Sequence, residues 1–368
     1  MRGILAEAYL HRLDPFAVEF PAGWPLGGLR WYGLAYLAGF VVAWLSIRWL
    51  TATRRSVIPV AAVADVIVYV VVGVLIGGRL GYCVFYQPSL FVKFTSALPF
   101  WAVLAIHDGG MSSHGGMFGV IASCWLFAVR YRISKLHLLD LMCLVSLPGL
   151  FFGRLANFVN AELRGTPLPL AMQSDPPWWS VKYPDEIKGL PLQELPKLGD
   201  AVTASGGSAF DFQQALGRLP DPEAHDLVNS TITRLVSEAQ AGNEGVIKVM
   251  RPLLEAHYPS QIFQALTDGP ILMGALVLVW LRPRKPGVIG AWFLMIYGLL
   301  RIASEFYRQP DPDVEVLKTP LGELSRGQVL SALMIIAGMI GLFIVARRDV
   351  EPLGGLLPTA RRGSRAPA

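Results

Sequence analysis

Charged residues are scarce in this chain. They make up 16% of its 368 residues, whereas an ordinary soluble domain carries about 25%. Hydrophobic residues account for 53%, and they are gathered in long runs. The length alone would suggest two soluble domains, but this composition excludes them and predicts an all-α polytopic membrane protein.

Cysteine is also rare, and its three copies, Cys83, Cys124 and Cys143, all fall inside apolar stretches. An odd count without CxxC spacing argues against a disulfide framework or a zinc site, so we interpret these residues as small and buried. The glycine-rich segments lack the GxxxxGK[ST] pattern of a phosphate-binding loop. The sequence therefore predicts neither a metal nor another cofactor.

The N-terminus lacks the apolar core of a cleavable signal peptide. Arg2, Glu7, Arg12, Asp14 and Glu19 interrupt it, so no such core forms before residue 30. The first membrane helix is therefore expected to be retained. The chain also lacks a convincing internal repeat, which argues against a transporter built from inverted halves.

What the chain does contain is a series of apolar segments near the roughly twenty residues that cross a bilayer core. The run at 97–106 is too short to cross and indicates an interfacial or re-entrant segment. Seven segments are predicted to span the membrane: 31–50, 64–86, 114–131, 136–158, 262–281, 287–307 and 328–346.

The basic residues indicate how these helices are oriented. The net charge is +5, but Lys and Arg collect in short clusters between apolar runs, which indicates membrane topology rather than nucleic-acid binding. The clusters alternate consistently onto one side, which the positive-inside rule assigns to the cytoplasm. An odd number of spans then puts the N-terminus outside and the C-terminus in the cytoplasm.

The long outer segment differs in composition from the rest, being rich in Pro, Gly and Asp, and part of it, 225–240, has helical periodicity. We interpret it as a small extracytoplasmic domain. The predicted order is an extracytoplasmic arm (1–30), four transmembrane helices with a glycine-rich histidine motif (31–164), an extracytoplasmic head domain (165–258), three transmembrane helices (259–346) and a basic cytoplasmic tail (347–368).

Polar residues near the outer ends of two predicted helices need an explanation, because a charge at membrane depth costs about 2.5–3.5 kcal/mol. In GRLANFVNAELRG, Arg154 and Asn157 are three apart and share a helix face, and Glu162 lies near the outer end. A helix end with snorkelling charges is the structural alternative. The uncharged run before Arg154 favours a functional site.

A second group lies in YGLLRIASEFYRQPD. Arg301, Glu305 and Arg308 recur at four and then three residues, which predicts one stripe along one helix, ended by Pro310 on the outer side. An intrahelical salt bridge would also explain the pattern.

Three further groups of residues share the outer side. Arg79 and Tyr82 in GGRLGYCVFY share a helix face, and Tyr32 follows Arg30 at the outer end of the first helix, where a belt tyrosine is the alternative. His114 in HDGGMSSHGGMFGV opens a helix among backbone amides, a position that suits an anion. Its glycine neighbours could instead permit close helix packing. Together these groups fit a phospholipid whose phosphate meets arginines, since guanidinium groups bind phosphate bidentately.

Six stretches resemble the prolipoprotein diacylglyceryl transferases, in that family's order and over all seven predicted helices: RWYGLAYLAGF, GGRLGYCVFY, DGGMSSHGGMFGV, GRLANFVNAELRG, YPSQIFQAL and LLRIASEFYRQPD. The similarity covers nearly everything except 166–256 and the C-terminal tail. It implies an integral enzyme of the bacterial cytoplasmic (inner) membrane. Such enzymes move the diacylglyceryl group of phosphatidylglycerol onto the lipobox cysteine thiol of a prolipoprotein and release glycerol phosphate. The implied partners are phosphatidylglycerol, prolipoprotein precursors and the lipid bilayer.

The resemblance also implies functional residues. The family's essential positions fall on Tyr32, His114, Arg154, Asn157, Glu162, Gly165, Arg301, Glu305 and Arg308. We predict catalytic roles for Tyr32, His114, Arg154, Arg301 and Glu305, and headgroup binding by Arg154, Asn157, Glu162, Gly165, Arg308, Arg79 and Tyr82.

The reaction gives these roles a physical reason. Because the phosphate charge grows as the thiol attacks, Arg154 and Arg301 would stabilise the transition state, with Glu305 orienting Arg301. His114 either assists deprotonation of the thiol or holds the lipid.

Three positions depart from the family pattern. Ser113 stands where an aromatic residue is common, and Phe263 and Gln264 replace a tyrosine and a glutamate. None of these changes removes a predicted Arg, His114 or Asn157, so activity is still expected. The alternatives are an anion transporter or channel and a non-enzymatic scaffold that binds anionic lipid. A transporter would need polar residues in the cytoplasmic halves of the helices, which are largely apolar here.

Overall fold

The computed structural model describes residues 7–21, 27–96, 98–106, 109–309, 317–319 and 322–357. Pro310 and residues 358–368, half of the predicted basic tail, lie outside the described residues. The chain divides into two compact units. The first comprises Met1–Ala35, Gly153–Leu266 and Ile302–Gly327, and the second comprises Tyr36–Phe152, Thr267–Arg301 and Gln328–Ala368.

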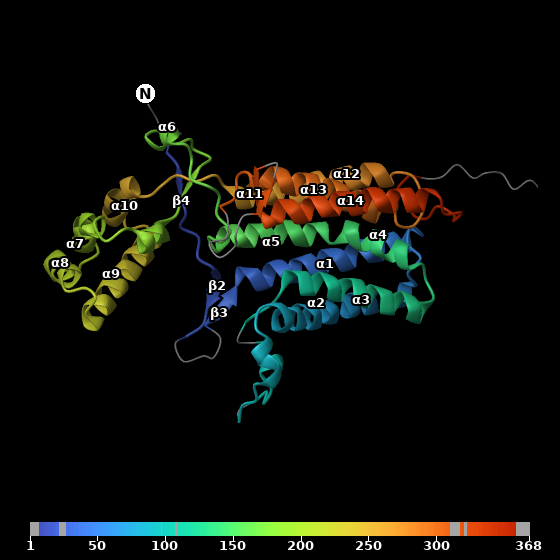
Figure 1. Ribbon diagram of the computed structural model, residues 1–368, viewed down its shortest axis with the longest axis horizontal. Coiled ribbons are helices and arrows are strands. Elements are labelled where there is room, and N and C mark those ends of the chain that lie inside the picture. The colour runs from blue at the N-terminus through green and yellow to red at the C-terminus, as the bar shows by residue number, and fades with distance from the viewer. Residues whose placement is uncertain are drawn as a thin grey trace, which may run out of the picture. The chain divides into compact units, whose positions relative to one another are not determined.

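Within the described residues, six helical segments are long and apolar enough to cross a membrane, which makes this a polytopic membrane protein. They are built from α1 (Trp31–Ala52), α2 (Val63–Phe85), α4 (Lys135–Val145) with α5 (Leu147–Val159), α11 (Ser260–Leu266) with α12 (Leu272–Trp280), α13 (Val288–Glu305) and α14 (Arg326–Ala346) (Figure 1). The prediction of a polytopic, mostly helical membrane protein is therefore confirmed, while the count of seven spans stays a prediction.

Two predicted spans are interrupted near prolines. The segment predicted at 136–158 changes from α4 to α5 at Ser146, two residues before Pro148, which lies in the first turn of α5. The segment predicted at 262–281 widens into a π-turn over Thr267–Ile271, which contains Pro270. Proline has no N–H to donate and crowds the preceding turn, so the regular helix gives way at these positions.

The remaining predicted span, 114–131, corresponds to α3 (Ser113–Tyr131), which is not among the six segments above. It packs against α2 through glycines on both helices. A Cβ atom on Gly119 would lie 1.9 Å from the carbonyl oxygen of Gly73, and one on Gly115 would lie 2.3 Å from that of Gly77. Close helix packing is thus confirmed for these two glycines of the histidine motif.

The interior of the second unit is apolar. Ile47 of α1, Val66 of α2, Phe127 of α3, Leu138 of α4 and Leu276 of α12 belong to one buried cluster. Burial of these side chains fixes the helices on which the polar residues of this unit stand.

The first unit contains short strands and a small helical bundle. The strand β1 (Tyr9–Leu10) pairs in parallel with β4 (Val181–Lys182), so the N-terminal segment is joined to the segment after α5. The antiparallel pairs are β2 (Phe16–Glu19) with β3 (Gly28–Arg30) and β5 (Leu317–Thr319) with β6 (Gly322–Leu324).

The helical bundle of the first unit lies between β4 and α11 in the chain, and its α7–α10 lie together in Figure 1. Its core includes Leu198, Phe212, Leu235 and Met250. The helix predicted at 225–240 is confirmed as part of α9. The bundle consists of α7 (Gly199–Ala204), α8 (Ala209–Gly217), α9 (Pro222–Ala241) and α10 (Glu244–Met250), whereas the short helix α6 (Leu170–Gln173) precedes β4.

Candidate functional site

Three predicted site residues, distant in the sequence, meet in the first unit. Tyr32 is the second residue of α1, Asn157 lies on the last turn of α5, and Glu162 follows that helix. The Tyr32 hydroxyl donates to Glu162 Oε2 at 3.0 Å, and the buried Asn157 amide donates to the Tyr32 hydroxyl. A longer contact of 3.4 Å joins Asn157 Nδ2 to Glu162 Oε2. The cluster presents a carboxylate, a hydroxyl and an amide at one place, a set suited to binding hydroxyl groups.

The chain after α5 runs beside the chain after α13. Gly165 and Arg308 form an antiparallel bridge, and Gln309 N donates to the Arg164 carbonyl at 3.0 Å. A Cβ atom on Gly165 would lie 2.0 Å from the Tyr258 carbonyl oxygen. Gly165 is therefore required by close backbone approach, whatever its part in headgroup binding.

The prediction that Arg301, Glu305 and Arg308 form one stripe along a helix is wrong for Arg308. The helix α13 ends at Glu305, where Arg308 N bonds to the Glu305 carbonyl in a tighter turn, and Arg308 then enters the bridge to Gly165. Arg308 Nη1 lies 3.7 Å from Glu305 Oε1, and both side chains are only about a tenth exposed. Ser325 Oγ donates to the same Glu305 oxygen at 3.1 Å. Glu305 and Arg308 are thus an ion pair at the end of the helix.

The two arginines predicted to hold the phosphate are both half-buried. Arg154 is on α5 in the first unit, and Arg301 is on α13 in the second. Their joint action on one phosphate stays a prediction.

Arg79 is 5% exposed, and its guanidinium donates to backbone carbonyls. Nε donates to Val103 at 2.7 Å and Nη2 to Ala102 at 2.6 Å, while Nη1 bonds Gly109 at 2.5 Å and Gly110 at 3.1 Å. Its Cζ lies 5.8 Å from the centre of the Tyr82 ring, so the shared helix face is confirmed. These contacts tie α2 to the segment before the histidine motif. Headgroup binding by Arg79 and Tyr82 stays a prediction.

His114 is exposed at the second position of α3, so its predicted place at a helix N-terminus is confirmed. Ser112 caps this helix by accepting from Gly115 N at 3.2 Å. His114 and Arg79 belong to the second unit, whereas the Tyr32 cluster belongs to the first.

The sequence profile of the family described as prolipoprotein diacylglyceryl transferase matches residues 21–344. The chain belongs to this family. It is 39% identical to the phosphatidylglycerol–prolipoprotein diacylglyceryl transferase of Bdellovibrio bacteriovorus over 92% of this chain and 94% of that protein. The enzymes of the same name from Ruegeria pomeroyi and Rhodospirillum rubrum are 34% and 35% identical, over 93% and 92% of this chain and 95% and 97% of theirs. The predicted family resemblance is confirmed.

Against this family background, the sequence analysis missed residues that surround the Glu162 segment. Arg164 pairs with Asp185, His257 contacts Glu186, and Gln261 donates to the Glu162 carbonyl. Arg164 stands inside the quoted motif GRLANFVNAELRG, so its charge was a usable signal. Asp185 and Glu186 lie in the segment without family resemblance, where only the fold shows their role.

The departures from the family pattern have visible surroundings. Phe263 on α11 makes an edge contact with Tyr307, with ring centres 5.7 Å apart, while Gln264 is buried and Ser113 is exposed.

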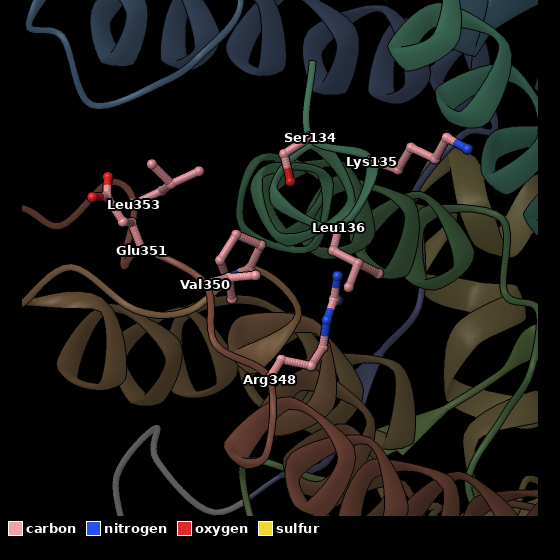
Figure 2. A pocket seen from close by; sticks show the side chains of 8 residues that line it. Ser134, Lys135, Leu136, Arg348, Val350, Glu351 and Leu353 are labelled. Carbon is pink, nitrogen blue, oxygen red and sulfur yellow. The ribbon is translucent and has the colours of Figure 1, made fainter. Parts of the chain in front are cut away.

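A separate cavity of about 460 Å³ lies where α4 begins and the chain leaves α14 (Figure 2). Its charged lining consists of Lys135, Arg348 and Glu351, but Lys135 Nζ stacks on the Trp125 ring at 3.8 Å. This cavity contains none of the predicted site residues.

Substituting Arg79 tests its contacts. In Arg79→Ala, the buried Val103 carbonyl would lose its donor, which costs about 1–3 kcal/mol, whereas the Ala102 carbonyl would keep its bond from Ala105 N. We expect the melting temperature of the detergent-solubilised protein to fall by several degrees. Arg79→Lys retains the charge but only part of the donor set, so its melting temperature should lie between those of the wild type and Arg79→Ala. Unchanged melting of Arg79→Ala, with loss of lipid affinity alone, would instead support headgroup binding.

Proposed function

We propose that this protein transfers the diacylglyceryl group of phosphatidylglycerol to the lipobox cysteine of a prolipoprotein. The thiol loses its proton, and its sulfur attacks the glyceryl carbon. The bond from that carbon to the phosphate oxygen breaks, and its electron pair stays on the phosphate. A thioether forms and glycerol phosphate leaves. Membership of the transferase family over residues 21–344 is the observation that carries this assignment.

Arginine side chains suit the charge change in this step. The phosphate starts as a diester with one negative charge and approaches two as the bond breaks, so cations that meet it stabilise the transition state more than the ground state. We assign this role to Arg154 and Arg301, with Glu305 orienting Arg301. The ion pair between Glu305 and Arg308 supports an orienting role for the carboxylate.

The Tyr32 cluster suits the uncharged part of the headgroup. Glu162 accepts hydrogen bonds, whereas Tyr32 and Asn157 both donate and accept. We propose that these three residues bind the glycerol hydroxyls of phosphatidylglycerol. Gly165 and Arg308 then shape this site, and His114 assists the incoming thiol or holds the lipid.

We propose an inner-membrane location with the N-terminus outside, the C-terminus in the cytoplasm and α3 as the seventh span. The arm at 1–30 and the head domain at 165–258 would then lie outside, where precursors with a lipobox arrive. The clustering of Lys and Arg between alternate helices supports this topology.

The test uses the purified full-length protein in vesicles with labelled phosphatidylglycerol, a lipobox peptide and no added metal. Label is expected to pass to the peptide, with glycerol phosphate released in equal amount, and a Cys→Ser peptide is the matched control. Lipid binding without turnover would point to a scaffold, and anion flux across the vesicle without transfer would point to a transporter. Either result would refute the proposed activity.

A further inference from the structure

Glu162 stands in a short segment with an unusual backbone. We call residues 161–165, which follow α5, the Glu162 loop. The residues on either side of Glu162, Ala161 and Leu163, have φ angles of 54° and 52°. This left-handed region is unfavourable for residues with a Cβ atom. The loop conformation must therefore be held by contacts from outside it.

Side chains supply those contacts by binding the loop's carbonyl oxygens. Gln261 Nε2 donates to Glu162 O at 2.6 Å, and Ser260 Oγ donates to Leu163 O at 2.8 Å. His257 Nδ1 lies 2.9 Å from Gly165 O. Ser260 and Gln261 are fully buried and His257 is 4% exposed. One short segment, 257–261, thus holds three of the five carbonyls in the loop.

A second set of contacts joins the loop to the 3-10 turn Pro184–Gly189. Arg164 pairs with Asp185, and its Nη1 lies 3.9 Å from Glu186 Oε1. The same Glu186 oxygen lies 2.7 Å from His257 Nε2. Glu186 therefore connects the loop's own arginine to the histidine that holds the end of the loop.

The contacts of His257 favour its protonated form. Its Nδ1 lies against the Gly165 carbonyl and its Nε2 against the Glu186 carboxylate, and two such acceptors stabilise an imidazole ring that carries hydrogen on both nitrogens. Burial lowers the pKa of His257, but the Glu186 carboxylate and the Gly165 carbonyl outweigh it, and the pKa lies above its ordinary value of 6.5. Glu186 and Glu255 act on the charge of the ring, and the Tyr183 ring centre lies 5.9 Å from its centre. Arg164 and Lys182 act on Glu186, and Asp185 pairs with Arg164.

We infer that Arg164, Glu186 and His257 are positioning residues for Glu162. They hold the loop in the conformation in which the Glu162 carboxylate meets Tyr32 and Asn157, and one of them, Glu186, belongs to the head segment that the quoted motifs do not cover. This inference rests on the proposed transfer reaction, in which Glu162 binds the lipid headgroup.

The sign of the pH effect follows from the raised pKa. The contribution of His257 is fully present below about pH 6.5, the ordinary value, and is lost as the pH rises through the higher pKa in the folded protein. Arginine at this position would keep its charge over the whole range. The thiol's own titration affects wild type and variant equally, so the ratio of their rates isolates His257.

The experiment measures kcat/KM for phosphatidylglycerol from about pH 5.5 to about pH 9, a range that brackets the ordinary histidine value. It uses the full-length wild type, His257→Arg and Glu186→Gln. We expect the ratio of wild type to His257→Arg to be constant at low pH and to fall about 10-fold at high pH, because small displacements of binding groups cost this much or more. Glu186→Gln should move the wild-type fall to lower pH, because the carboxylate that raises the pKa is gone.

The matched control is Glu194→Gln. This variant also removes one carboxylate from the head domain, but the partner of Glu194 is the exposed Lys197. The pH profile of the wild type should therefore persist. A flat ratio, or an unmoved fall in Glu186→Gln, would overturn the positioning role. If His257→Arg fails to fold, the Glu186→Gln profile decides alone, since the amide has the shape of the carboxylate. Absence of transfer by the wild type at every pH would instead overturn the proposed function, and this inference with it.

Discussion

Replacing Arg301 with alanine is expected to lower kcat for diacylglyceryl transfer by at least about 10²-fold, the usual effect of removing one donor from a developing negative charge. Arg301 is half-buried near the C-terminal end of α13. A cation that meets the leaving phosphate gains strength as charge develops there, and alanine supplies neither charge nor donor. The measurement is single-turnover transfer from labelled phosphatidylglycerol to a lipobox peptide, at saturating lipid.

Two variants make the result specific. Arg301→Lys keeps the charge but loses the planar fork, so an intermediate rate is expected. Arg218→Ala removes an arginine whose partner is the exposed Asp221, and surface pairs of this kind contribute about 0–1 kcal/mol, so the rate should not change. Full activity of Arg301→Lys would show that bidentate phosphate binding is not needed.

Apolar run length was enough to predict the membrane architecture, because a bilayer requires about twenty apolar residues in each crossing helix. The helix α9 was equally accessible from its periodicity. The interruptions at Ser146 and Thr267–Ile271 were not predicted, although Pro148 and Pro270 mark them in the sequence. Mean hydropathy is averaged over a window of residues, so it does not detect the one backbone N–H that a proline lacks.

The candidate site divides in a similar way. Motif resemblance named Tyr32, Asn157 and Glu162, and the fold brings their side chains into contact. Arg308 was misplaced because helical spacing continues in the sequence beyond the point where the backbone leaves the helix. The roles of Glu186 and His257 depend on tertiary contacts between segments about 70 residues apart, which no local pattern encodes.

Alanine substitutions at two glycines of the histidine motif are expected to change the stability of the protein in opposite directions. Gly116→Ala adds a methyl group whose nearest neighbour is 3.8 Å away, an ordinary contact. Alanine also favours a helix over glycine by about 0.5–1 kcal/mol, so a small gain in stability is expected. Gly119→Ala would place the same methyl group 1.9 Å from the Gly73 carbonyl oxygen, which is backbone and cannot move alone. The helices α2 and α3 must separate, and we expect a net loss of about 1–3 kcal/mol.

Thermal melting of both variants in the same detergent decides between packing and anion binding as the reason for these glycines. Packing predicts that melting rises slightly for Gly116→Ala and falls for Gly119→Ala, with transfer reduced only in the second. Because α3 begins with the His114 turn, a shift of this helix displaces that side chain as well. If Gly119→Ala melted normally and still lost transfer, the glycine would serve the lipid site directly, and the close approach of α2 and α3 would be incidental to it.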